Sequence, residues 1–75
     1  MEATRKVISI VTPCYNEQDN VADCYEAVKR VFTDLLPAYD FEQVFCDNCS
    51  SDRTPEVLRE LAAKDPRVKV ILNAR

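Results

Sequence analysis

Residues 6–17 read KVISIVTPCYNE and contain the clearest fold signal in the chain. The segment 6–12 is rich in β-branched side chains and almost continuously apolar, which is typical of a strand buried on both faces of a parallel sheet. We expect this strand to end at Pro13, because proline interrupts strand pairing. The polar residues 14–20 then predict a loop at the carboxyl end of the strand.

A helix is predicted directly after this loop. Apolar side chains recur with helical spacing from Val21 to Leu36, so one face of the helix is expected to be buried. Either Asp19 or Asn20 can cap its start. Pro37 is expected to end it, because the residue before a proline is pushed out of the helical region.

The rest of the chain predicts a second strand, a second helix and a third strand. Segments 41–46 and 68–72 are short, apolar and β-branched or aromatic, as strands are. Thr54 and Pro55 form a strong helix start, and the helix is expected to run from Pro55 to about Lys64. Strand, helix, strand, helix, strand is the βαβαβ order of a parallel α/β half-sheet of the Rossmann-like type.

Polar residues gather where the predicted strands end. Such sheets bind ligands outside the carboxyl ends of their strands, which here means residues 12–17, 46–52 and 73–75. Tyr15 can stack on a base, and Asn16 and Glu17 can hydrogen-bond a base edge or a ribose. The alternative is that Pro13 and Asn16 only shape the turn and that Glu17 is favoured by the helix N-terminus that follows it.

A second polar cluster runs from Asp47 to Thr54. The Asp47 carboxylate can accept a hydrogen bond from a nucleobase imide or a ribose hydroxyl. Asp52 and Thr54 are expected to be structural instead, because they precede the second helix and can satisfy its free amides.

The cysteines leave two further classes open. Cys46 and Cys49 have C-x-x-C spacing after a strand, which allows a thiol-redox site or a zinc site with Cys14 and Cys24. The predicted helix begins several residues after Cys49, so thiol activation by that helix is expected to be weak, and small buried thiols are the simpler interpretation. A non-catalytic interaction domain is the third alternative.

The composition of the 75-residue chain excludes several functions. The net charge is -3 with the signs mixed along the chain, so no nucleic-acid partner is indicated. The absence of glycine excludes a P-loop and a dinucleotide fingerprint, and the absence of histidine excludes a Ser-His-Asp triad. No stretch approaches the roughly 20 apolar residues of a membrane span, and no signal peptide is recognisable. We expect a cytoplasmic location, extending to the cytoplasmic face of the membrane for the intact protein.

Two motifs in this order resemble the signatures of family 2 glycosyltransferases. Residues 9–17, SIVTPCYNE, resemble the opening strand and P-x-Y-N-E motif, and residues 44–54, VFCDNCSSDRT, resemble the D-[DN]-x-S-x-D-x-T segment. Residues 55–75 are similar to the next segment of that family, so the resemblance covers nearly the whole chain. Cys49 and Arg53 stand where the family usually has glycine, which leaves the conformation of this loop open.

The resemblance implies that residues 1–75 are the N-terminal, nucleotide-binding part of a GT-A glycosyltransferase domain. Pro13 and Tyr15 would line the base pocket, Glu17 would lie near the nucleoside, Asp47 would bond the base, often uracil, and Arg75 would approach the pyrophosphate. The full set implied for nucleotide-sugar binding is Pro13, Tyr15, Asn16, Glu17, Asp47, Asn48 and Arg75.

The resemblance also sets expectations for the reaction. The closest similarity is to bacterial polyprenyl-phosphate sugar transferases, which implies a UDP-linked donor and a lipid-phosphate or saccharide acceptor. The family's D-x-D metal site and catalytic base come later than residue 75. We therefore expect Mg2+ or Mn2+ in the intact enzyme, none on this chain alone, and a fragment that is inactive by itself. An uncovered sheet face and unpaired strand edges are expected to favour a homo-oligomer.

Overall fold

The structure is a computed structural model that describes residues 6–73. The elements follow the predicted order: β1 (Val7–Cys14), α1 (Val21–Asp34), β2 (Asp40–Asn48), α2 (Thr54–Lys64) and β3 (Val68–Asn73). All strands are parallel and lie in the order β1-β2-β3, with β2 in the centre. The chain therefore forms the predicted parallel βαβαβ half-sheet.

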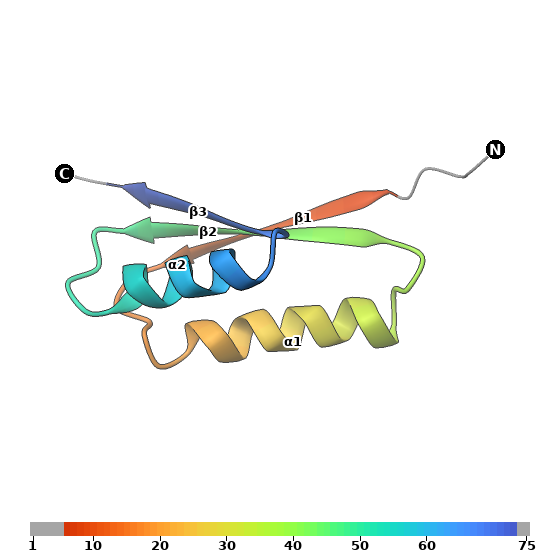
Figure 1. Cartoon of the computed structure of the whole chain (residues 1–75), viewed down its shortest axis with the longest axis horizontal. Coiled ribbons are helices and arrows are strands. Elements are labelled where there is room, and N and C mark those ends of the chain that lie inside the picture. The colour runs from red at the N-terminus through yellow and green to blue at the C-terminus, as the bar shows by residue number, and fades with distance from the viewer. Residues whose placement is uncertain (1–5, 74–75) are drawn as a thin grey trace.

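Both helices cover the same face of the sheet (Figure 1). Crossover connections between parallel strands are right-handed, and the chain moves across the sheet in one direction, so both crossovers place their helix on the same side. The core between the helices and the sheet consists of buried residues from every element: Cys14, Val21, Tyr25, Phe45, Leu58, Leu61 and Val68.

The other face of the sheet is exposed, and this corrects the prediction of a first strand buried on both faces. Exposure alternates along β1, where Val7 is 59% and Val11 is 64% exposed while Ile8 and Ile10 are half-buried. Ile71 of β3 lies on the same open face and is 49% exposed. The apolar run is continuous in the sequence, but only one of its two faces packs against a helix in residues 6–73.

The prediction that Pro13 ends the first strand is also wrong. β1 continues through Pro13, which stands opposite Cys46, to Cys14, which stands opposite Asp47. A proline cannot donate a backbone hydrogen bond, and this is tolerated on an edge strand. Because β1 pairs only with β2 in this sheet, Pro13 occupies such an edge.

Both ends of α1 differ from the sequence expectation. Asn20 occupies the N-cap position but its side chain makes no cap hydrogen bond; its Nδ2 donates instead to Glu17 Oε2 at 3.0 Å. The helix ends at Asp34, before Pro37 is reached, and the N–H groups of Leu35 and Leu36 both donate to the Val31 carbonyl. Leu35 lies outside the helix and is 73% exposed, so it is not part of the predicted buried face.

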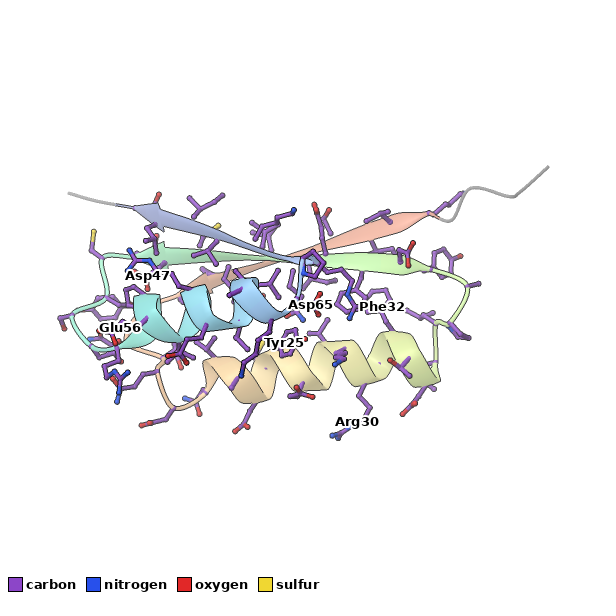
Figure 2. All side chains as sticks on the ribbon, viewed as in Figure 1. Tyr25, Arg30, Phe32, Asp47, Glu56 and Asp65 are labelled. Atoms are coloured by element: carbon purple, nitrogen blue, oxygen red, sulfur yellow. The ribbon has the colours of Figure 1, made fainter. Side chains whose placement is uncertain are left out.

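One polar cluster, the Tyr25 clip, joins α1 to the turn between α2 and β3 near the middle of the sheet (Figure 2), and it consists of Tyr25, Asp65 and Arg67. The Tyr25 hydroxyl donates to Asp65 Oδ2 at 2.6 Å, and Arg67 donates to both carboxylate oxygens at 3.0 Å. Hydrogen bonding from Arg67 holds the pKa of Asp65 well below its usual range. The hydrogen bond to Asp65, together with burial, raises the pKa of Tyr25 to about 12.

Candidate functional site

Two polar loops meet at the carboxyl edge of the sheet. All three strands point toward this edge, where the segment between β1 and α1 lies beside the segment between β2 and α2 (Figure 1). These segments are residues 15–20 and 49–53; they contain most of the two signature motifs, which also include the last residues of β1 and β2 and the first residue of α2. The sequence expectation that the motifs converge at this edge is thus met by the fold.

Side chains of the second segment accept hydrogen bonds from backbone amides of the first. Asn16 N–H donates to Ser50 Oγ at 2.9 Å, and Glu17 N–H donates to Thr54 Oγ1 at 2.8 Å. Gln18 N–H donates to the Asp52 carboxylate at 3.3 Å. Three consecutive amides that no helix or strand uses are satisfied in this way.

The exchange also runs in the opposite direction. Ser51 N–H donates to Asn16 Oδ1 at 2.8 Å, and Arg53 N–H donates to Gln18 Oε1 at 2.8 Å. Asn16 and Gln18 therefore each give a backbone donor and a side-chain acceptor to the other segment. We call this reciprocal set the loop lock; its side chains are Asn16, Gln18, Ser50, Asp52 and Thr54.

Asp52 and Thr54 have the structural role that the sequence predicts, with one change of position. Thr54 is the first residue of α2 rather than its cap, and Asp52 Oδ1 accepts the Thr54 N–H at 2.9 Å and the Thr54 hydroxyl at 2.5 Å. Desolvation raises the pKa of Asp52, but the hydrogen bonds from Thr54 and Gln18 outweigh it, so the pKa is lowered overall.

Two residues of these segments have left-handed backbone conformations. Asn16 has φ 50° and Cys49 has φ 57°. Asparagine tolerates this region better than most residues, whereas cysteine adopts it at a cost. Cys49 thus keeps a conformation that glycine adopts freely, while Arg53, the second departure from the family pattern, has an unstrained φ of -86°.

Asp47 lies at the end of β2 on the face that the helices cover (Figure 2). Its side chain is only 2% exposed, and both carboxylate oxygens accept from Ser50, Oδ1 from the hydroxyl and Oδ2 from the N–H at 3.1 Å. Its neighbour in register is Cys14. Burial, followed by the negative charge of Asp47, raises the pKa of the Cys14 thiol to about 11, so this thiol is inert at neutral pH.

The remaining predicted site residues are spread around this edge. Tyr15 is 61% exposed, so its ring is accessible for stacking. Pro13 lies on the exposed face beside Cys46, away from the side to which Cys14 points. Asn48 is exposed, and its Oδ1 accepts from Asn73 Nδ2 at 2.8 Å. Arg75 lies outside the described residues.

A cavity of about 180 Å³ lies between the end of β1 and the start of α1. Pro13, Cys14, Glu17 and Cys24 contribute to its lining, whereas Tyr15 and Asp47 do not. Ligand pockets for drug-sized molecules measure roughly 300–1,000 Å³. The cavity is therefore smaller than a typical ligand pocket, and Tyr15 and Asp47 lie outside it.

The four cysteines are free thiols. Cys46 projects from β2, and the Cys49 thiol donates to the Asn73 carbonyl at 3.0 Å, while α2 begins only at Thr54. Cys49 is thus not at the helix N-terminus, where a redox thiol would be activated. Within residues 6–73, no three His, Cys, Asp or Glu side chains are grouped so as to hold a metal ion.

Sequence reasoning did not single out Gln18, Ser50, Ser51 and Asn73 as individual contacts at this edge. Ser50 is the serine of the second signature motif, so the motif was the signal that could have identified it as a contact at this edge. Gln18 and Ser51 carry no comparable signal, because their partners lie 34 or 35 residues away in the chain.

No helix among residues 6–73 is both long and apolar enough for a membrane crossing.

An open parallel sheet with polar loops at its carboxyl edge defines a class of ligand-binding α/β proteins. Within that class, residues 9–75 match the family model described as glycosyl transferase family 2. The chain belongs to this family of enzymes. The family and the fold agree with the resemblance carried by the two motifs.

Several curated relatives are glycosyltransferases by name. The chain is 41% identical over 63 residues to "Uncharacterized glycosyltransferase YkcC" of Bacillus subtilis (strain 168), covering 84% of this chain and 19% of the relative. It is 39% identical over 69 residues to "Putative glycosyltransferase CsbB" of the same organism, covering 92% and 20%. It is also 39% identical over 61 residues to the bactoprenol glucosyl transferase of Shigella phage SfX, covering 81% and 19%. The chain thus spans about a fifth of the length of these relatives.

Proposed function

We propose that this chain is the nucleotide-binding half of a glycosyltransferase that takes its sugar from a UDP-linked donor. The observation that carries the proposal is the buried Asp47 carboxylate at the carboxyl end of β2, with the exposed ring of Tyr15 on the adjacent segment. A carboxylate that already accepts two hydrogen bonds retains further lone pairs. These can accept the imide N–H of uracil while Tyr15 stacks on the base.

The acceptor is proposed from similarity. The name of the Shigella phage relative specifies bactoprenol, a lipid, and this supports a lipid-phosphate acceptor for the whole protein, with a saccharide as the second candidate. Such an acceptor favours a location in the cytoplasm at the membrane face. Arg75 is proposed to approach the donor pyrophosphate.

The chemical step is proposed to lie elsewhere in the whole protein. A glycosyltransferase of this type needs a divalent cation, Mg2+ or Mn2+, on the leaving diphosphate and a base for the acceptor. The described residues do not fit a metal site of their own. We therefore expect this chain to bind nucleotide and to be inactive as a transferase by itself.

An amide-resolved NMR titration of the reduced, metal-free chain with UDP, and with ADP for comparison, tests the donor. UDP is expected to shift the amides of Tyr15, Glu17 and Asp47 at lower concentration than ADP, because adenine offers an acceptor where uracil offers a donor. Asp47→Ala is expected to abolish these shifts, and Asp23→Ala, an exposed carboxylate of α1, serves as the matched control. Equal responses to both nucleotides, or a response that survives Asp47→Ala, would contradict the proposal.

Self-association is a separate proposal. The open face of the sheet carries Val7, Val11 and Ile71, all well exposed, and β1 and β3 are edge strands. These features support a homo-oligomer of the chain. Light scattering over a dilution series is expected to show a mass above 8.6 kDa that falls on dilution. A constant monomer mass would contradict it.

A further inference from the structure

Ser50 is the residue of the loop lock that contacts both parts of the proposed base site. Its hydroxyl accepts the Asn16 N–H at 2.9 Å and donates to Asp47 Oδ1. Its own N–H donates to Asp47 Oδ2 at 3.1 Å. One half-buried side chain therefore connects the segment that carries Tyr15 with the carboxylate at the end of β2.

The contacts of Ser50 fix the orientation of the Asp47 carboxylate. Each oxygen of Asp47 holds one donor from the same residue, so rotation about the carboxyl group would break both bonds at once. The side chain is 2% exposed, so solvent competes little for the two bonds from Ser50. The lone pairs that remain free on Asp47 thus point in directions that Ser50 determines.

Ser50 also fixes the backbone beside Tyr15. Asn16 has a left-handed conformation, its N–H is held by Ser50, and its Oδ1 accepts from Ser51 N–H at 2.8 Å. On the other side, Cys14 is buried and paired with β2. Tyr15 is therefore held between two fixed neighbours, although its own ring is exposed.

We propose that Ser50 is a positioning residue for the base: it orients the Asp47 acceptor and holds the backbone next to Tyr15, so that a uracil can meet the carboxylate and the tyrosine at once. This inference rests on the proposed UDP-binding function and deepens it. Ser50 acts through Asp47 and Asn16. Its loss is expected to weaken UDP binding and also to reduce the preference for UDP over ADP.

The test compares UDP and ADP affinities, by NMR titration of the chain, among Ser50 variants. Ser50→Ala is expected to weaken UDP binding about tenfold, the effect of losing roughly one charge-assisted hydrogen bond, with a smaller effect on ADP. Ser50→Thr keeps the hydroxyl and is expected to restore most of the affinity. Ser9→Ala is the matched control, because the exposed Ser9 hydroxyl of β1 donates to Glu42 and contacts neither loop, and this variant is expected to bind like the unmodified chain.

The readouts separate a positioning role from a merely structural one. A structural defect would lower the affinities for UDP and ADP by the same factor, whereas misplacement of Asp47 lowers the UDP affinity more. If Ser50→Ala does not fold, Ser50→Cys, which keeps the volume and only a weak donor, is measured in its place. Unchanged UDP affinity and preference in a folded Ser50→Ala or Ser50→Cys chain would overturn the inference while leaving the proposed function intact. Absence of UDP binding by the unmodified chain would refute the proposed function, and the role of Ser50 with it.

Discussion

Replacement of Tyr25 by phenylalanine isolates a single hydrogen bond of the Tyr25 clip. The Tyr25 ring is buried, and its hydroxyl donates to Asp65 at 2.6 Å. Tyr25→Phe removes the oxygen and keeps the ring in place. Asp65 keeps its bonds from Arg67, so no buried charge is left unpaired.

The expected loss of stability can be reached by two routes. A hydrogen bond to a charged group contributes about 1.5–3 kcal/mol. The rise in the Tyr25 pKa from 10.0 to about 12 gives an upper bound of about 2.7 kcal/mol at about 1.36 kcal/mol per pKa unit, because the hydrogen bond to Asp65, burial and the charge of Asp65 all contribute to the rise. A chain of 75 residues has a free energy of unfolding of roughly 4–11 kcal/mol, so the loss is a large fraction of the total.

The pH dependence of this loss has a definite sign. The folded pKa of Tyr25 is raised, so its contribution is complete below pH 10 and is lost as the pH rises toward about 12. The folded pKa of Asp65 is lowered, so its contribution is complete above about pH 4, the unfolded value, and is lost as the pH falls. The difference between the unmodified chain and Tyr25→Phe is therefore expected to be largest near neutral pH and to shrink in strong alkali.

Urea unfolding followed by far-UV circular dichroism measures the effect, and Tyr15→Phe is the control. Tyr15 is exposed, so removal of its hydroxyl is expected to change stability by less than about 0.5 kcal/mol. A loss for Tyr25→Phe as small as that of the control would refute the reasoning. So would a loss that stays constant from pH 7 to pH 12.

Three further predictions concern single buried or strained positions. Cys49→Gly is expected to raise the free energy of unfolding in urea by up to about 1 kcal/mol, because Cys49 has a left-handed φ of 57°. The control Cys46→Gly, in β2, is expected to lower it by about 0.5–1 kcal/mol. Changes of the same sign in both variants would contradict this prediction. Gln43→Met is expected to change stability by less than about 1 kcal/mol, because it removes a buried amide oxygen that has no hydrogen-bond partner among the described residues but also the bond from Gln43 Nε2 to the Tyr25 carbonyl; a loss above about 2 kcal/mol would count against it. Cys14 is expected to react with iodoacetamide about 100-fold more slowly than an ordinary thiol, because burial raises its pKa from 9.0 to about 11, and peptide mass spectrometry would reveal a faster reaction.

The order of strands and helices could be predicted from the sequence, but some of their ends could not. The apolar run around Ile10 and the helical spacing around Tyr25 are local signals, and both predicted the correct element. Pro13 was misjudged because its effect depends on whether β1 is an edge strand, which is a property of the sheet rather than of the neighbouring residues. Asn20 was a plausible cap, but the nearby Glu17 carboxylate takes its side chain.

The candidate site was predicted in location and only partly in detail. The motifs placed Tyr15 and Asp47 at the correct edge because carboxyl ends of parallel strands share one edge. The bonds of Ser50 to Asn16 could not be derived from sequence, since they join residues 34 positions apart through a particular loop conformation. The role of each residue in nucleotide binding stays a prediction.

The Tyr25 clip and the Asp47 carboxylate lie at different positions along β2. Arg67 of the clip lies 4.4 Å from the ring centroid of Phe41, near the start of β2, while Asp47 lies near its end, roughly 20 Å away at about 3.3 Å per residue. Substitutions farther apart than about 7–10 Å usually combine additively. Epistasis between substitutions at the Tyr25 clip and substitutions at Asp47 is therefore expected to be small. Stability lost through a change of base preference at Asp47 can accordingly be restored by substitutions at the clip.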